Sequence, residues 1–401
     1  MKAALSLIYQ QLLKQIPLDH TRFLFDQFHL KDRLTGLVGP RGSGKTTLLL
    51  QYIKQHLSVD ETFYFSADHI YFTQITLYEF VMQLHLEDGV QTVFIDEIHK
   101  YKQWNQELKN VYDSFPKLTI AFSGSSSLDL VKGSYDLSRR AKLFRLPGMS
   151  FREYVQLTSK TSYPILTWDE LLQSPQKAYE RIGDVPRVMS HFKDYLRHGF
   201  YPFYYEQPLS YHEKLLAVLD KTIFEDIAEF YHLKTPHLSL LRKLVAYLAT
   251  VPPGTVSTHN LAKNMQVDDK TVLGFLMQLQ ETGLVRMVYP AEPGRAQLTR
   301  PAKIFLSNVN MQYALEANIN TPISLGTVRE LFFVQALQDA AIPVFHSKIG
   351  DYEVSGTIFE IGGQSKTGKQ IQSAERAFLV KDDIYAPTRR DIPLWLFGFL
   401  Y

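Results

Sequence analysis

Residues 39–46 read Gly-Pro-Arg-Gly-Ser-Gly-Lys-Thr, and this octapeptide constrains the fold more than any other segment of the chain. It follows the apolar run Leu34–Val38, which predicts a buried strand, and precedes the run Leu48–Ile53, which predicts a helix. Glycines in such a strand-to-helix turn let backbone N–H groups surround phosphate oxygens, while lysine and threonine supply a cation and a magnesium ligand. The segment therefore predicts a P-loop that binds a nucleoside triphosphate together with Mg²⁺.

Within this loop, we expect Lys45 to reach the β and γ phosphates and Thr46 to hold Mg²⁺. The whole nucleotide-binding loop is predicted to comprise nine consecutive residues: Gly39, Pro40, Arg41, Gly42, Ser43, Gly44, Lys45, Thr46 and Thr47.

An acidic pair, Asp96 and Glu97, comes directly after the apolar run Thr92–Ile95. A buried parallel strand that delivers a carboxylate at its C-terminal end is what magnesium coordination beside a P-loop needs. Asp96 is thus predicted to bind Mg²⁺, directly or through water. Glu97 is then placed to orient and polarise the attacking water.

Serines follow the next predicted strand, and Ser123 and Ser125 are the candidates for a hydroxyl that senses the γ-phosphate or the attacking water. A Ser/Gly cluster is equally typical of an ordinary strand-to-helix turn, so both interpretations stay open. Arg139 and Arg140 precede the fifth strand. Either could stabilise transition-state charge, in its own subunit or in a neighbouring one, or could simply be solvated.

The pattern along the chain predicts an α/β fold with further domains behind it. Five short β-like runs alternate with helical stretches, which indicates a parallel sheet covered by helices, at residues 34–38, 62–65, 92–95, 118–122 and 143–146. A helix, a turn, a second helix and a β-like arm then favour a winged-helix domain, and the last segment favours a small α/β domain. The predicted boundaries are 1–27 (N-terminal helical segment), 28–150 (P-loop core), 151–235 (helical region), 236–320 (winged helix) and 321–401 (small α/β domain).

Charge and cysteine content exclude several classes of protein. The 43 lysines and arginines nearly balance the 41 aspartates and glutamates, so no global positive field draws the chain to nucleic acid or anionic lipid. The chain has no cysteine, which fits a reducing compartment. No run approaches the roughly 18 apolar residues of a membrane span. We therefore expect a cytoplasmic protein with no membrane contact.

Taken together, these motifs resemble those of a family of bacterial and archaeal AAA-type ATPases. The family carries a C-terminal domain of unknown function related to the restriction-endonuclease, or PD-(D/E)xK, fold. The resemblance extends over almost the whole chain. It rests on residues 39–46, on Asp96-Glu97-Ile98-His99-Lys100 with Trp104 and Leu108, on Ser123-Gly124-Ser125-Ser126, on Leu137-Ser138-Arg139-Arg140 and on residues 146–154.

The resemblance implies ATP as the nucleotide, and it implies that residues 151–235 form a helical lid over it. It also implies that Arg140 matches the family's arginine before the last core strand, which makes this residue the first choice for an arginine finger. In the lid, residues 199–202 read Gly-Phe-Tyr-Pro, where Phe200 replaces a glycine of the family pattern.

The C-terminal region is similar to the family's nuclease-like domain, but it lacks parts of a working site. Such a site needs clustered carboxylates to hold metal and a nearby lysine. The resemblance places Ser355 at an acid position and Gly362 at the lysine position, which predicts a degenerate structural domain. The remaining candidates for an ATP-gated, metal-dependent nuclease are Glu330, Glu353, Glu360 and Lys366.

DNA binding through the winged-helix segment is an open alternative. The second helix, residues 269–282, carries an apolar face and is flanked by acidic residues, which is typical of a packing element rather than of a base-reading helix. A basic wing could still contact phosphates through Arg286, Arg295, Arg300 and Lys303.

The sequence as a whole favours a Mg²⁺-dependent ATPase that acts as a nucleotide-driven switch on a partner, with an unknown protein as one candidate. A regulator that binds DNA or protein around a mainly structural nucleotide is the alternative from another class. A homo-oligomer is possible, because an arginine finger acting between subunits would require one.

Overall fold

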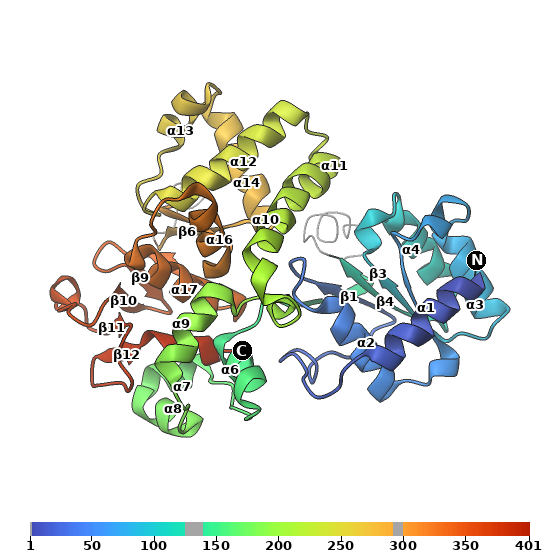
Figure 1. The fold of residues 1–401 in the computed structure, drawn as a ribbon, viewed down its shortest axis with the longest axis horizontal. Helices are drawn as coiled ribbons and strands as arrows, with labels where there is room; N and C mark the ends of the chain where they lie inside the picture. The colour runs from blue at the N-terminus through green and yellow to red at the C-terminus, as the bar shows by residue number, and fades with distance from the viewer. Residues whose placement is uncertain (1, 125–138, 292–299) are drawn as a thin grey trace. The chain divides into compact units, whose positions relative to one another are not determined.

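The computed structural model describes residues 2–124, 139–291 and 300–401. The chain forms two compact units, Met1–Gly148 and Met149–Tyr401 (Figure 1). Within the described ranges, no helix has both the length and the apolar character that crossing a membrane requires.

The first unit contains a five-stranded parallel sheet with the strand order β2-β3-β4-β1-β5. The α/β parallel sheet expected from the sequence is thereby confirmed. Each of the five predicted β-like runs overlaps a strand: β1 (Leu34–Val38), β2 (Thr62–Ser66), β3 (Thr92–Asp96), β4 (Thr119–Gly124) and β5 (Ala141–Arg145).

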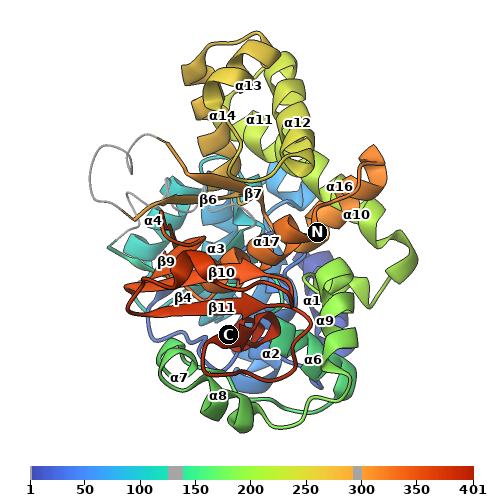
Figure 2. The same cartoon turned by 90° about the vertical axis from the view of Figure 1, so that its left-hand side faces the viewer.

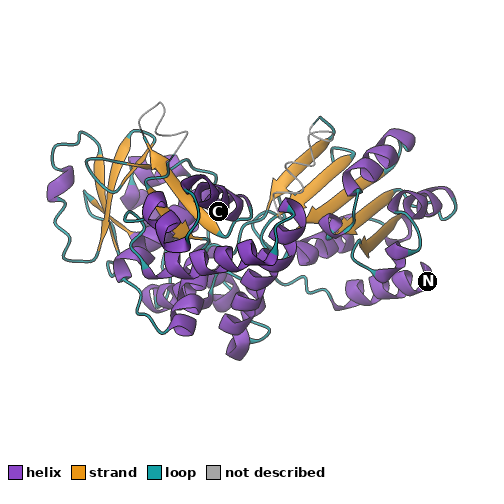
Figure 3. Cartoon of the chain, turned by 90° about the horizontal axis from the view of Figure 1, so that it is seen from above, coloured by secondary structure: helices purple, strands orange, loops and turns teal. Residues whose placement is uncertain are grey.

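Helices cover both faces of this sheet (Figure 3). The apolar side chains of α1 (Lys2–Gln15) and α2 (Lys45–His56) contribute mainly to the core on one face. Those of α3 (Leu77–Leu86) and α4 (Trp104–Ser114) form the core on the other. Strands buried on both faces are rich in apolar residues throughout, which explains why the predicted runs show no polar alternation.

The parallel arrangement brings the C-terminal ends of β1, β3 and β4 to one edge of the sheet. Register pairs Val38 with Gly124 and Ile95 with Phe122. The residues that follow β1 and end β3 and β4 must therefore lie close together, and they include the P-loop and Asp96.

The second unit combines a seven-stranded mixed sheet with a large set of helices. The strand order is β12-β11-β10-β9-β8-β6-β7. Its strands are β6 (Val285–Pro290), β7 (Lys303–Leu306), β8 (Phe345–His346), β9 (Tyr352–Val354), β10 (Thr357–Gly362), β11 (Ala377–Lys381) and β12 (Asp391–Pro393). Its described α-helices are α6 (Phe151–Ser159), α7 (Trp168–Gln173), α8 (Pro175–Ile182), α9 (Val188–His198), α10 (Tyr211–Lys221), α11 (Ala228–Tyr231), α12 (Thr235–Thr250), α13 (Thr258–Met265), α14 (Asp269–Glu281), α16 (Val309–Ile319) and α17 (Leu325–Asp339).

The helices α12, α13 and α14 lead into the antiparallel pair β6 and β7 (Figure 2). This order matches the helices and β-like arm expected at residues 236–320. However, β6 also pairs in parallel with β8, so the sheet runs across the boundary expected between residues 320 and 321.

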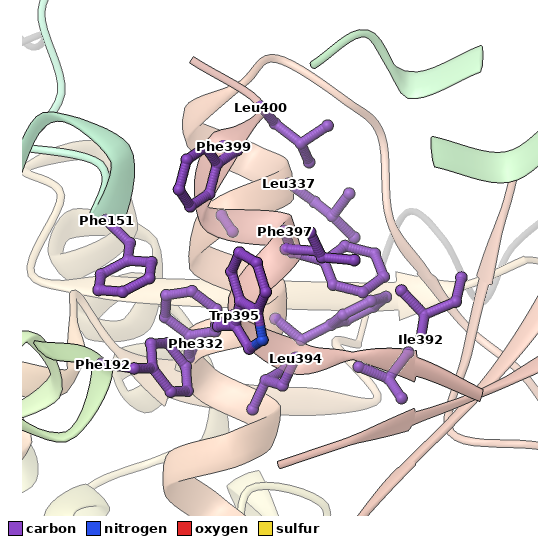
Figure 4. Packing of buried hydrophobic residues seen from close by; sticks show 14 of the residues in the cluster. Phe151, Phe192, Phe332, Leu337, Ile392, Leu394, Trp395, Phe397, Phe399 and Leu400 are labelled. Carbon is purple, nitrogen blue, oxygen red and sulfur yellow. The ribbon is translucent and has the colours of Figure 1, made fainter. Parts of the chain in front are cut away.

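One hydrophobic core joins segments that the sequence pattern assigned to different domains. Phe151 of α6 and Phe192 of α9 pack with Phe332 of α17 and with Trp395 and Phe399 of the 3₁₀ segment η9, Leu394–Phe399 (Figure 4). Helices from the expected lid therefore share their interior with residues near the end of the chain.

A buried asparagine ties further helices of this unit together. The Asn310 side chain of α16 is 0% exposed and donates to the carbonyls of Tyr195 and Leu196 at 2.9 Å each, so it caps the C-terminal end of α9. Its Oδ1 accepts from the Phe200 amide at 2.8 Å and from the Tyr211 hydroxyl at 2.5 Å. The segment containing Phe200 is thus fixed by contacts inside its own unit.

Candidate functional site

The P-loop connects β1 to α2 and turns through two glycines. Gly42 and Gly44 have φ angles of 78° and 92°, a left-handed conformation that glycine adopts at little cost. The Lys45 ammonium, 5% exposed, donates to the carbonyls of Gly39 at 3.0 Å and Pro40 at 3.1 Å. The lysine thus folds back over its own loop, where its charge lies beside the N-terminus of α2.

Gly39 has no room for a side chain. A Cβ atom built on it would lie 2.1 Å from the backbone oxygen of Leu146. The amide of Leu146 in turn donates to the Val38 carbonyl at 2.8 Å, so the segment after β5 is fixed directly against the start of the loop. This close backbone approach is the physical reason for glycine at position 39.

Asp96 is the centre of the hydrogen-bond network at this edge of the sheet. Its Oδ2 accepts from the Thr46 hydroxyl at 2.5 Å and from the Tyr64 hydroxyl at 2.7 Å. Its Oδ1 accepts from the Ser123 hydroxyl and from the Glu97 amide, the latter at 3.0 Å. Adjacent carboxylate and hydroxyl oxygens from Asp96 and Thr46 fit Mg²⁺, which binds one or two protein oxygens along with phosphate and water.

Glu97 follows β3 in a left-handed backbone conformation, with φ 50° and ψ 38°. Its carboxylate Oε2 lies 3.4 Å from Nε2 of the buried His99. Burial raises the pKa of Glu97 and the neighbouring Asp96 adds to this, whereas Lys45 and Arg41 lower it. The arrangement gives a buried carboxylate with a raised pKa near the P-loop residues Lys45 and Arg41, and a raised pKa is a property that a general base needs.

Tyr64 is a member of the site that sequence reasoning missed. It lies on β2, whose residues pair in register with β3, and its buried hydroxyl reaches Asp96 across the two strands. Burial first, and then the Asp96 charge, raise the pKa of Tyr64. The phenol is therefore a hydrogen-bond donor at every physiological pH. A polar-tipped residue in an otherwise apolar strand beside β3 was the available sequence signal.

Of the two candidate serines, Ser123 lies in the site and Ser125 lies outside the described residues. Ser123 is 0% exposed, and its hydroxyl donates to Asp96 while its oxygen is 3.4 Å from the Glu97 amide nitrogen. It therefore supports the acidic pair in this structure; a sensing role stays a prediction.

Arg140 lies at the opposite end of the sheet from the P-loop. It precedes β5, whose first residue Ala141 pairs with Leu34 at the start of β1. Its guanidinium contacts Asp113, with Nε 3.3 Å from Oδ1. The expectation that it could act on its own P-loop is contradicted, because about five residues of strand at ~3.3 Å each separate the two ends. A role towards a neighbouring subunit stays a prediction.

The nuclease candidates of the second unit are engaged in other contacts. Glu330 accepts from the Lys303 ammonium and from the Tyr352 hydroxyl, at 2.6 Å each. Glu360 pairs with Lys366 at 3.0 Å. In the described part of the chain, no three His, Cys, Asp or Glu side chains are grouped so that they could hold a metal ion.

Gly362, which stands where the family resemblance places a lysine, has a steric role. A Cβ atom on Gly362 would lie 2.7 Å from the side chain of Lys366, so glycine makes room for the lysine stem that reaches Glu360.

Glu353 lies on β9 opposite Ile358 of β10. Sequence reasoning also overlooked Asp351, which accepts from the Ile361 amide at 2.8 Å and lies 3.6 Å from the Lys303 ammonium.

Two residues of the expected basic wing are buried in ion pairs. Arg286, whose side chain is 12% exposed, binds both carboxylate oxygens of Asp339 at 2.9 Å. Lys303 is held by Glu330. The expectation that these two contact DNA phosphates is therefore wrong, because their charges are already neutralised inside the fold. Arg300 is exposed, and Arg295 lies outside the described residues.

Comparison with known families agrees with the geometry of the first unit. Residues 31–155 match a family model described as an AAA domain. The first unit is therefore similar to AAA-type P-loop domains. Residues 189–322 match a second family model, described only as a domain of unknown function, DUF8612. The restriction-endonuclease-like nature expected for residues 321–401 has no support from these matches.

Among curated proteins, the chain is similar to an uncharacterized protein of Methanocaldococcus jannaschii, with 29% identity over 300 residues. The match covers 71% of this chain and 63% of that protein's length.

Three solved structures show partial likeness. A katanin self-assembly structure covers 45% of this chain and 64% of its own, at 18% identity and TM-score 0.27. The match to AMPPCP-bound DnaA from Aquifex aeolicus covers 68% of this chain and 86% of the DnaA chain, at 16% identity and a TM-score of 0.23. The match to C. elegans PCH-2 covers 67% of this chain and 67% of the PCH-2 chain, at 18% identity and a TM-score of 0.26.

Proposed function

We propose that the chain is a Mg²⁺-dependent ATPase whose first unit binds and hydrolyses ATP. The observation that carries this proposal is the Asp96 network, in which one carboxylate contacts the P-loop hydroxyl of Thr46, the hydroxyl of Ser123 and the amide of Glu97. A P-loop alone is consistent with nucleotide binding. An acid pair fixed beside it adds the groups that hydrolysis needs.

In the proposed reaction, the P-loop amides and Lys45 bind the phosphates, and Thr46 and Asp96 would hold Mg²⁺. When bound, the ion would neutralise charge on the β- and γ-phosphate oxygens. Glu97 would accept a proton from the attacking water, for which its raised pKa suits it better than an ordinary carboxylate. The water oxygen would form a bond to the γ-phosphorus while the bond from this phosphorus to the β–γ bridging oxygen breaks, so that ADP leaves with that oxygen. Ser123 would keep the Glu97 backbone in place through Asp96.

The broader role of the chain as a nucleotide-driven switch on a protein partner is part of this proposal. It is motivated by the pairing of the AAA-type domain with a second unit whose candidate nuclease acids, Glu330 and Glu360, are bound by lysines. A cytoplasmic location and assembly into a homo-oligomer also belong to this proposal, and a DNA partner is tested in the assay below.

The deciding experiment is steady-state ATP hydrolysis with Mg²⁺ by the full chain, Lys45→Ala and Glu97→Gln. We expect Glu97→Gln to retain ATP binding but to lose about 10²- to 10⁴-fold in kcat, the usual contribution of a positioned acid–base group. Lys45→Ala should lose binding as well. The matched controls are Glu61→Gln and Lys117→Ala, which change exposed residues of the same unit and should leave turnover unchanged.

Adding duplex and single-stranded DNA to the same assay tests the alternative role. Stimulation of turnover would place nucleic acid first among the partners. ATP binding by the wild-type chain without any turnover would instead favour a regulator with a structural nucleotide and would contradict the proposed ATPase.

A further inference from the structure

Arg22 lies in the segment between α1 and β1 and binds backbone oxygens from two distant parts of the first unit. Its guanidinium donates to the carbonyl of Ser43 in the P-loop. It also donates, at 2.9 Å each, to the carbonyls of Pro147 and Gly148, which follow β5 and end the unit. One rigid, planar cation thus connects the phosphate loop to the exit of the chain from its unit.

The contact with Ser43 has a direct effect on the loop's donors. In a planar trans peptide the C=O and the following N–H point in opposite directions. Because Arg22 fixes the Ser43 carbonyl, the amide of Gly44 must point away from Arg22. Gly44 is the residue directly before α2, whose N-terminal amides are the expected phosphate donors.

The contact with Pro147 and Gly148 lies where the chain passes to the second unit. The next residue, Met149, is fixed from the other side: its amide donates to the Phe200 carbonyl at 2.7 Å, and its carbonyl accepts from the Tyr195 hydroxyl at 2.8 Å. Gly148 is therefore held by contacts within the first unit, and Met149 by contacts within the second.

We propose that Arg22 is a positioning residue that couples the state of the P-loop to the connection at Gly148–Met149. Phosphate binding that shifts the Ser43–Gly44 peptide would change the Arg22 contacts and hence the anchoring of Gly148. This inference rests on nucleotide binding in the proposed function, but it does not require hydrolysis. It names the route by which the loop would affect the second unit.

The test is amide hydrogen exchange of the full chain with and without a non-hydrolysable ATP analogue and Mg²⁺, read on peptides from residues 149–159. In the wild type we expect the analogue to change exchange in this segment. Arg22→Gln should still bind the analogue, with Kd raised by no more than about tenfold for a lost charge-assisted hydrogen bond. In Arg22→Gln, the change in exchange caused by the analogue should fall to less than half of the change in the wild type. Arg22→Lys, which keeps the charge without the fork of donors, should be intermediate.

Arg33→Gln is the matched control. Arg33 also binds backbone carbonyls of the first unit, those of Tyr112 at 2.6 Å and Phe115 at 3.2 Å, but at the end of the sheet where β1 begins. It should keep the full exchange response. Thermal unfolding of each variant separates loss of coupling from loss of folding.

The inference is overturned by an unchanged response in Arg22→Gln, by an equal loss in Arg33→Gln, or by a wild type that binds the analogue without any response. Absence of ATP hydrolysis alongside a response lost only in Arg22→Gln would overturn the proposed ATPase and leave this coupling standing.

Discussion

The hydroxyl of Tyr64 lies 2.7 Å from Oδ2 of Asp96, the same oxygen that accepts from Thr46. The proposed magnesium ligand is thus held by a phenol from the neighbouring strand β2. Groups that orient a metal ligand in this way affect metal affinity even though they do not touch the metal.

Tyr64→Phe should therefore raise the Mg²⁺ concentration for half-maximal nucleotide binding by about tenfold or more, as expected for loss of a group that orients a metal ligand. Binding of a fluorescent ATP analogue, titrated with Mg²⁺, measures this without relying on turnover. Tyr78→Phe is the control, because the Tyr78 hydroxyl contacts Ser114. An unchanged Mg²⁺ dependence in Tyr64→Phe would show that the phenol does not position Asp96.

Gly39→Ala should impair both folding and binding. The new Cβ would meet the Leu146 oxygen, so the segment after β5 must move away from the loop. Overpacking of this kind costs about 1–3 kcal/mol of stability. Denaturant unfolding and nucleotide binding measure the two effects. Gly274→Ala, in α14 with open space around it, should be neutral or slightly stabilising. Normal ATP affinity in Gly39→Ala would contradict the required close approach.

The raised pKa of Glu97 predicts opposite pH dependences for turnover and for the stability of the folded state. As a base, the carboxylate must be ionised, so turnover should fall as pH drops through a pKa above the ordinary range of glutamate. For stability, a carboxyl whose folded pKa is raised favours the folded state at low pH and loses this contribution as pH rises through the folded pKa.

Glu97→Gln, which mimics the protonated acid, should accordingly be more stable than the wild type at neutral pH. The difference should shrink as pH falls through the folded pKa of Glu97. Thermal unfolding between pH 5 and 8 measures it, with Glu61→Gln as the exposed control. A stability difference that grows towards low pH would show that burial does not raise this pKa.

Asn310→Leu should destabilise the second unit strongly. It removes the partner of two carbonyls, one amide and one hydroxyl in a fully buried place. A buried polar group left without its partner costs about 1–3 kcal/mol, so a loss of about 4 kcal/mol or more is expected for the set. Asn318→Leu changes an exposed asparagine of the same helix and should cost little. Equal unfolding free energies for the two variants would contradict the role of the network.

Mixing variants tests whether Arg140 acts between subunits. The P-loop of the same chain lies at the other end of the sheet from Arg140, so the arginine could serve only the P-loop of a neighbouring subunit. If it does, Arg140→Ala alone and Lys45→Ala alone should both be deficient in turnover. A mixture of the two variants should then regain turnover, since intact P-loops of one variant meet intact arginines of the other. Full activity of Arg140→Ala would end its candidacy.

The sequence indicated that residues 39–46 and the acidic pair would meet at one edge of the sheet, because each segment gives a local signal. The octapeptide and the acidic pair each follow an apolar strand, and parallel pairing then brings them together. Tyr64 and Arg22 were not predictable in the same way. Their partners are 32, 21, 125 and 126 residues away, and only the folded register and loop path create these contacts.

The second unit shows the same limit on a larger scale. The helix observed at 269–281 was predicted at 269–282, since apolar periodicity is a local signal. The pairing of β6 with β8, however, has no counterpart in any short pattern. The basic residues Arg286 and Lys303 were misread for a similar reason, because their acidic partners lie 53 and 27 residues further along.

The core shown in Figure 4 joins residues that are synthesised at widely separated times. Arg152 of α6 donates from Nε to the carbonyl of Tyr401 at 3.0 Å, a partner 249 residues later. At roughly 5–20 residues per second, Arg152 is synthesised about 12 to 50 s before Tyr401. For nearly all of this interval Phe151 lacks its packing partner Phe399, so the core that joins these two residues cannot close until residue 399 has been synthesised.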